Sequence, residues 1–193
     1  MGRRHAARGI CLLAIALASC SSGEIQRDPE LRRELLEMRD ADQAERTGQA
    51  PGGVETDRAR AERLKEIIDE HGWPTIDLVG RDGASAAWLI AQHADFDVAL
   101  QERALELMRE ALDDDQVDPV DVAYLEDRVA VNRGRPQTYG TQIRCMDGRP
   151  QPATPIRGEA GVDARRKEVG LDPLEDYYAE LEEACAAEAA GMP

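Results

Sequence analysis

The sequence predicts a mainly α-helical protein, a small helical domain with one short β-hairpin. Most of the chain after residue 27 places apolar residues at the three- and four-residue spacing of amphipathic helices. Asp-Pro pairs, which favour the start of a helix, occur at three places. Only residues 138–157 change to short extended runs, on either side of the turn pair Asp147-Gly148.

The first two expected helices lie on either side of a glycine-rich segment. One begins at Asp28-Pro29, and the other covers residues 57–70. Residues 47–56 contain three glycines and a proline, so they are expected to form a flexible internal loop. The apolar faces are formed by Leu31, Leu35 and Met38 in the first helix and by Ala61, Leu64 and Ile68 in the second.

The middle of the chain is expected to contain a loop and three helices. Residues 71–85 are rich in turn residues, including Asp82-Gly83, and predict a loop. Residues 84–94 are apolar nearly all round and predict a buried helix. A longer helix over residues 95–113 carries Phe96, Leu100, Leu107 and Ala111 in register. The next helix begins at Asp118-Pro119, continues to about Asn132 and stops at Gly134.

The last part of the chain predicts the hairpin and then two more helices. The extended runs around Asp147-Gly148 form the hairpin. A short helix is expected within residues 161–170, and a final one opens at Asp172-Pro173 and continues to about residue 190. Aromatic residues make up only 4% of the chain, so its core must consist mainly of Leu, Ile, Val and Ala.

The amino-terminal segment has the organisation of a secretory signal. Residues 1–8 contain three arginines and no acid, and residues 9–18 form an apolar run. This run is too short to cross a bilayer, which takes about 20 residues. Leu17-Ala18-Ser19-Cys20 resembles the lipobox of bacterial lipoproteins, in which the cysteine thiol receives a diacylglycerol and the signal is removed before it.

We therefore expect a lipoprotein signal peptide at residues 1–19, lipidation at Cys20, a polar tether over residues 20–27 and a single domain over residues 28–190. An ordinary signal peptide, or a core helix that contains a cysteine, is the alternative. The expected location is outside the cytoplasm, with a soluble domain lipid-anchored to the bacterial cell envelope. Several acyl chains anchor a protein stably, whereas one does so weakly.

The charge of the chain restricts its partners. It has 24 Lys and Arg, three of them in the signal, and 39 Asp and Glu, none of them in the signal, so the mature chain carries a net charge of −18. Such a charge repels phosphate backbones and argues against nucleic acid as a partner. The expected partners are the membrane, through the lipid anchor, and an envelope protein or glycan.

Two cysteines remain once Cys11 has left with the signal and Cys20 carries lipid. Cys145 and Cys185 form an even pair in an exported and oxidising compartment, which favours a disulfide between them. Two unrelated buried thiols are the alternative.

Several segments resemble a bacterial family called domain of unknown function 6624. They are DQAER, HGWP, AAWLIAQHAD, AYLEDRVAVNRGRPQTYGTQ and DARRKEVGLDPLEDY. The resemblance covers residues 31–178 and implies a small, mostly helical domain without an assigned activity. The polar positions that it marks here are Asp42, Gln43, Arg46, Trp73, His93, Asp127, Arg128, Tyr139, Thr141 and Gln142.

Two of these positions also stand out from the helical pattern alone. Asp127 shares one face with Val120, Tyr124 and Val131, and His93 lies one turn after Leu89 and Ile90. A buried carboxylate requires hydrogen bonds or a charge partner. His93, Tyr139, Arg144 and Arg165 are the partners considered for Asp127.

One interpretation of these positions is a satisfied polar cluster that fixes the helix register. The other is a pocket for a ligand or a proton. The candidate pocket residues are Trp73, His93, Asp127, Arg128, Tyr139 and Gln142.

The residue pattern argues against several known chemistries. Ser85 would lie about 12 Å from His93 on one helix, too far for a nucleophile and its base. Only two histidines, His71 and His93, remain after removal of the signal and they lack helical i, i+4 spacing, and a Walker loop and a dinucleotide fingerprint are absent, so no metal and no cofactor are expected. Catalytic residues cannot be assigned from the sequence. We expect a membrane-tethered binding or structural module; the alternative is an envelope hydrolase that uses His93 and Asp127 as acid/base groups.

Overall fold

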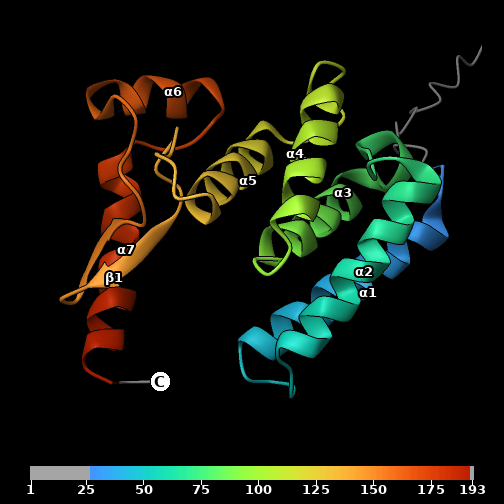
Figure 1. Ribbon diagram of the computed structural model, residues 1–193, viewed down its shortest axis with the longest axis horizontal. Helices are drawn as coiled ribbons and strands as arrows, with labels where there is room; N and C mark the ends of the chain where they lie inside the picture. The colour runs from blue at the N-terminus through green and yellow to red at the C-terminus, as the bar shows by residue number, and fades with distance from the viewer. Residues whose placement is uncertain (1–26, 192–193) are drawn as a thin grey trace, which may run out of the picture.

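The computed structural model describes residues 27–191 and shows a mainly α-helical protein with one short hairpin, as the sequence predicts (Figure 1). The elements are α1 (Pro29–Arg46), α2 (Val54–His71), α3 (Ile76–His93), α4 (Val98–Leu112), α5 (Pro119–Asn132), β1 (Ile143–Met146), β2 (Arg149–Pro152), the 3-10 segment η1 (Glu159–Gly161), α6 (Val162–Glu168) and α7 (Leu174–Ala189). Cys20 and the signal lie outside the described residues. Within residues 27–191, no helix has the length and apolar character needed to cross a membrane.

Aspartates begin two helices as expected. The side chains of Asp28 and Asp118 accept hydrogen bonds from the backbone N–H of Leu31 and Val120, each at 2.9 Å. The start of α7 differs from the prediction, because Pro173 occupies the cap position and has no side-chain acceptor. Asp163 from α6 accepts from the Leu174 N–H at 2.9 Å instead, so a residue distant in sequence caps α7.

The prediction of a loop over residues 71–85 is wrong for most of its length, because α3 begins at Ile76. The turn residues in this segment produce a kink inside the helix. Gly80 has φ 77° and ψ 163°, a conformation that favours glycine. A Cβ atom on Gly83 would lie 2.9 Å from the Cβ of Val79, so a glycine also permits close packing after the kink.

The starts of two other helices differ from the predicted ones. Helix α2 begins at Val54, which shortens the preceding loop to residues 47–53. Helix α4 begins at Val98 with Asp97 as its cap, so the predicted helix starts too early. Phe96, expected on the apolar face of that helix, precedes it and is 38% exposed.

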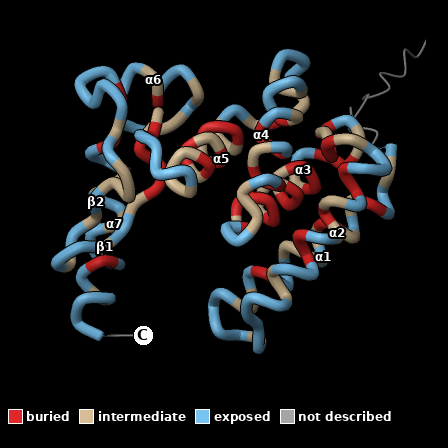
Figure 2. The backbone as a smooth tube through the Cα atoms, in the orientation of Figure 1, coloured by how far each residue is buried: buried red, intermediate tan, exposed pale blue. Residues whose placement is uncertain are grey.

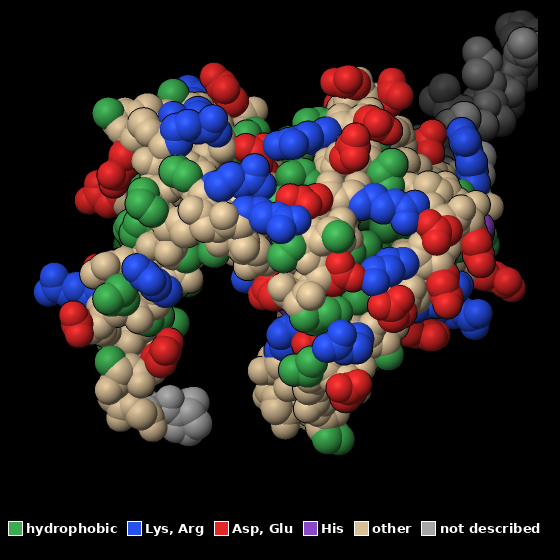
Figure 3. Space-filling model, in the orientation of Figure 1, with side chains coloured by type: hydrophobic (Ala, Val, Ile, Leu, Met, Phe, Trp, Pro, Cys, Tyr) green, Lys and Arg blue, Asp and Glu red, His purple; other side chains and the backbone are tan. Residues whose placement is uncertain are grey.

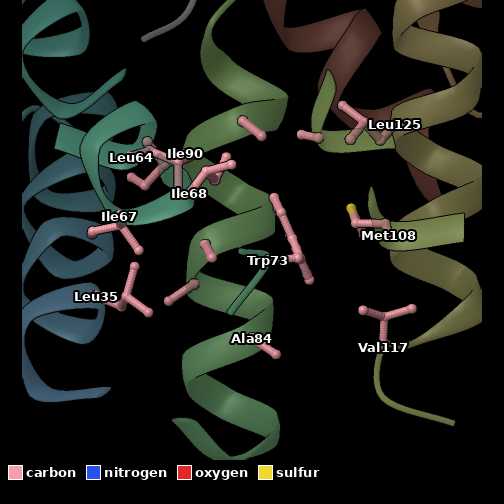
Figure 4. Packing of buried hydrophobic residues seen from close by; sticks show 14 of the residues in the cluster. Leu35, Leu64, Ile67, Ile68, Trp73, Ala84, Ile90, Met108, Val117 and Leu125 are labelled. Carbon is pink, nitrogen blue, oxygen red and sulfur yellow. The ribbon is translucent and has the colours of Figure 1, made fainter. Parts of the chain in front are cut away.

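Helix α3 is the centre of the fold and contacts α1, α2, α4 and α5. Figure 2 shows the buried residues concentrated along it. The main hydrophobic cluster takes residues from α1 to α5 and the connections between them, the last being Val129 (Figure 4). Its members include Leu35, Leu64, Ile67, Trp73, Ile90, Met108 and Leu125.

The chain after α5 forms a C-terminal lobe, residues 135–191, which lies on the opposite side of α5 from α1 and α2 (Figure 1). Strands β1 and β2 pair antiparallel around Asp147 and Gly148, whose φ values are 52° and 74°. Positive φ at both positions is the requirement of a type I′ hairpin turn. Cys145 on β1 is bonded to Cys185 on α7, with their Cα atoms 5.2 Å apart, which confirms the predicted disulfide.

Candidate functional site

The residues proposed as one pocket lie in three separate places. One group surrounds Asp127, which is 0% exposed on α5. Its carboxylate accepts backbone N–H hydrogen bonds from Thr138 at 2.6 Å, Tyr139 at 3.1 Å and Thr141 at 2.9 Å. The Thr141 hydroxyl donates a further bond at 3.1 Å. Asp127 is therefore buried as predicted, and of the partners considered only Tyr139 bonds it, through its backbone N–H. The other donors come from the same loop, and His93, Arg144 and Arg165 are not among them.

The other residues of this loop are also fixed by hydrogen bonds. Gln137 accepts from the Gln142 N–H at 2.8 Å and donates to the Gln142 carbonyl at 2.9 Å. Arg166, only 1% exposed, donates to the Tyr139 carbonyl at 2.9 Å. The Asp127 cluster, which we define as Asp127 with residues 137–142, thus joins α5 to the C-terminal lobe.

Both carboxylate oxygens of Asp127 accept hydrogen bonds from the protein, so neither is available for acid–base chemistry. Burial raises the pKa of the Asp127 carboxyl, and the N–H donors of Thr141, Thr138 and Tyr139 counteract this increase. The geometry of Asp127 and Gln142 therefore favours the interpretation of a satisfied polar cluster that fixes the register of α5.

A second group is the His93 cluster, defined as Asp42, Gln43, Arg46, His93 and Arg128, which come from α1, α3 and α5. Asp42 is 1% exposed, and one of its carboxylate oxygens lies 2.8 Å from Nδ1 of His93. Gln43 donates to the same oxygen at 2.9 Å. The structure thus pairs a histidine near the end of α3 with an aspartate 51 residues earlier in the chain.

The protonation of His93 follows from its neighbours. Nε of Arg46 lies 2.9 Å from His93 Nδ1 and 3.1 Å from the Asp42 carboxylate. One ring nitrogen cannot donate and accept at once, and a carboxylate is the stronger acceptor. We therefore assign the Nδ1 proton to the bond with Asp42, and the Arg46 Nε–H donates to Asp42 as well. This tautomer leaves Nε2 with a free lone pair and no hydrogen-bond partner among residues 27–191.

Two opposing effects set the pKa of each member of this pair. Burial lowers the pKa of His93, Asp42 raises it, and Arg46 lowers it again, so that it lies below its ordinary value. Burial acts to raise the pKa of Asp42, but the hydrogen bond from Arg46 and the charge of His93 hold it below its ordinary value. At neutral pH the site therefore contains a neutral imidazole beside an ionised carboxylate.

Helix α2 holds the cluster from one side. Arg46 also bonds Asp57 at 3.2 Å. Arg60, 9% exposed, bonds Asp57 at 2.7 Å and Glu45 at 2.8 Å. This network orients Arg46 toward His93.

Helix α5 forms the other side. Arg128 bonds Asp95, which follows α3, at 3.3 Å. Trp88 on α3 and Tyr124 on α5 meet edge to face with ring centroids 6.1 Å apart. Gln92 follows Trp88 by four residues on α3, and Arg128 follows Tyr124 by four residues on α5. Each therefore lies one turn further along the same face of its helix. Oε1 of Gln92 and Nε of Arg128 are buried and have no partner in the described part of the chain.

Trp73 belongs to neither group. It is 5% exposed and lies between α3 and the side chains of Met108 and Val117 (Figure 4). It lines a cavity of about 490 Å³.

Helical spacing also marks Asp42, which sequence reasoning did not single out as buried. Leu31, Leu35, Met38 and Asp42 have the same i, i+4, i+7, i+11 spacing as the face that carries Asp127. Asp42 and Arg46 are one turn apart and therefore neighbours on α1. Nothing in the local pattern indicates that His93 is their partner.

Comparison with protein-family models gives one result. The model described as a family of unknown function, DUF6624, matches residues 29–189. The chain belongs to the DUF6624 family. No curated protein and no solved structure matches it. The DUF6624 region extends from the start of α1 to the end of α7 and contains the Asp127 cluster, the His93 cluster and Trp73. Because the description of DUF6624 assigns no activity, a function for this chain has to be inferred from the geometry of these groups.

Proposed function

We propose that this chain is a lipid-anchored protein of the bacterial cell envelope whose DUF6624 domain binds an envelope glycan at the His93 cluster. The observation that carries the proposal is the 2.8 Å contact between Asp42 and His93, which fixes the imidazole and leaves Nε2 free. The amino-terminal lipobox ending at Cys20 supports the anchor and the location.

The hydrogen-bonding groups of the cluster suit a polyhydroxylated ligand. Nε2 of His93 accepts from a hydroxyl, whereas the guanidinium groups of Arg46 and Arg128 donate to one. A sugar supplies donors and acceptors on adjacent carbons. The uncharged sugar backbone of a glycan also avoids the repulsion that a phosphate polymer meets from a mature chain of net charge −18. Figure 3 shows acidic and basic side chains interspersed over the face in view, without a large basic patch.

Sedimentation with purified peptidoglycan sacculi tests the proposal. The full chain in detergent should sediment with the sacculi, and His93→Ala should reduce the bound fraction by about tenfold, because one well-oriented hydrogen bond to a ligand is lost. His71→Ala is the matched control, since His71 lies at the end of α2, outside the cluster. Equal sedimentation of the two variants, or no sedimentation of the unmodified chain, contradicts the proposal.

A second candidate is an acid–base enzyme of the envelope. It is favoured by the Asp–His arrangement, in which the carboxylate orients the ring and Nε2 faces the reacting group. The alternative derived from the sequence combined His93 with Asp127, but Asp42 has the geometry for that role. If sacculi are hydrolysed, Asp42→Asn should lower the release of soluble fragments by about 10²- to 10⁴-fold. Release that is unchanged in Asp42→Asn contradicts this candidate.

A further inference from the structure

The cavity beside Trp73 is lined by both apolar and polar side chains. It lies where α3, α4 and the start of α5 meet, and its volume is about 490 Å³, within the range of small-molecule sites. Ile76, Ala84, Met108 and Val117 supply apolar surface. Arg32, Trp73, Arg81, Asp82, Ser85, Asp118 and Asp121 supply the polar groups.

Two polar groups of this cavity are incompletely paired. The indole N–H of Trp73 is buried without an acceptor in residues 27–191, although buried indole N–H groups usually have one. The carboxylate of Asp121 has a second carboxylate, Asp118, beside it and the Ser85 hydroxyl as its donor. Burial and the charge of Asp118 raise the pKa of Asp121 to about 7.

The cationic side chains at the cavity do not neutralise Asp121. Arg32 forms an ion pair with Asp82. Arg81 is exposed at the rim. An ionised Asp121 is therefore a half-buried charge without a counter-ion among the residues described, a situation that a bound cation relieves.

We propose that the Trp73 cavity binds a small primary amine that carries a neighbouring carbonyl group, the chemistry of an amino-acid amide. The ammonium group pairs with Asp121 and Asp118. The carbonyl oxygen accepts from the Trp73 N–H, and an aliphatic side chain packs against Met108 and Val117. This site is separate from the His93 cluster and does not depend on the glycan proposal.

Calorimetric titration of the full chain at about pH 7, where the α-amino group of an amino-acid amide is still mostly protonated and Asp121 is about half ionised, tests the ligand chemistry with three probes of one aliphatic body. L-leucinamide has the amine and the carbonyl, isopentylamine has only the amine, and 4-methylpentanamide has only the carbonyl. We expect L-leucinamide to bind, with isopentylamine about tenfold weaker and 4-methylpentanamide at least about tenfold weaker. Absence of L-leucinamide binding up to about 10 mM, or equal binding of 4-methylpentanamide, overturns the proposal.

Two variants locate the ligand, each with a matched control. Asp121→Asn should weaken L-leucinamide binding by about tenfold or more, whereas Asp114→Asn, in the exposed acidic loop, should change it less than about twofold. Trp73→Phe keeps an aromatic ring without the N–H and should weaken binding about three- to tenfold. Trp88→Phe is its control, since the Trp88 N–H is also buried and unpartnered but does not line the cavity. Loss of binding in the control variants, or full binding in Asp121→Asn, overturns the assignment to this cavity.

Discussion

Asp127 shows how one side chain can hold two parts of a molecule together. Its buried carboxylate takes its hydrogen bonds from the backbone and side chain of residues 138–141. Truncation of Asp127 would leave three N–H groups of that loop without this acceptor, of which that of Thr141 is buried. Each such group costs about 1–3 kcal/mol when it is unsatisfied.

We therefore expect Asp127→Ala to lower the free energy of unfolding by about 3–5 kcal/mol. Asp114→Ala, at an exposed position, should lower it by about 0.5 kcal/mol or less. Urea denaturation of both variants measures the difference. A near-neutral Asp127→Ala would show that the loop finds other acceptors and that the cluster does not hold the lobe to α5.

Asp121 provides a prediction about pH. Its pKa is about 7 in the folded protein and about 3.9 in an unfolded chain, so the folded state binds the proton more tightly. Ionised Asp121 destabilises the folded state. This loss of unfolding free energy is absent below about pH 4, grows as the pH rises toward 7 and is complete above it. Asp121→Asn should therefore raise the free energy of unfolding by about 1–3 kcal/mol at pH 8 and leave it nearly unchanged at pH 4. Denaturation at the two pH values tests this, and an equal effect at both would exclude titration of Asp121 as the cause.

The residues of the candidate site differ in how far the sequence could predict them. Helical spacing was sufficient for the burial of Asp127, and it applies equally to Asp42. The partnership of Asp42 with His93 joins residues 51 positions apart. It depends on how α1 packs against α3, and no local spacing encodes that packing. The sequence pattern did not mark Asp121, because its environment arises only where three helices meet at a cavity.

At the scale of elements, a helix start was predictable where an aspartate before proline caps it, because such a cap is a bond between residues two or three positions apart. Asp28 and Asp118 illustrate this. The start of α3 was missed because Gly80 acts as a kink between two helical segments rather than as a loop residue. The burial of Ile76 and Val79 outweighs the turn-forming character of their neighbours.

The disulfide leads to a prediction for the hairpin and α7. It joins residues 40 positions apart, and a loop of that length corresponds to about 4 kcal/mol in the chain-entropy model. The double variant Cys145→Ala/Cys185→Ala should lose about this much unfolding free energy under oxidising conditions. With a reducing agent present, the unmodified chain should fall to a similar stability. A variant as stable as the oxidised parent would indicate that the bond contributes nothing to the folded lobe.

At the scale of the whole molecule, the fold class was predictable because apolar spacing is a local property and is repeated over each helix. The arrangement into a core of α1–α5 and a separate C-terminal lobe was not. This arrangement depends on which helix faces pack against one another, and two faces of α5 are buried in such contacts. Val122, Leu125 and Val129 face the core, whereas Asp127 faces the lobe.

The location of the molecule can be tested through Cys20, which lies outside the described residues. We expect the full chain, produced in a bacterium, to partition into the detergent phase because a lipidated Cys20 anchors it. Cys20→Ala should partition into the aqueous phase. Release of the unmodified chain into the aqueous phase would contradict the anchor, and mass spectrometry of the amino-terminal peptide identifies the attached group.

The division between core and lobe also bears on the order in which an exported chain can assemble. The amino-terminal part of such a chain is available to fold first, and the main hydrophobic cluster is complete at Val129. On the proposed location outside the cytoplasm, the bundle of α1–α5 can therefore form before the rest of the chain has crossed the membrane. Cys185 emerges 40 residues after Cys145, so the oxidation that closes the lobe is a late event on a preassembled helical template.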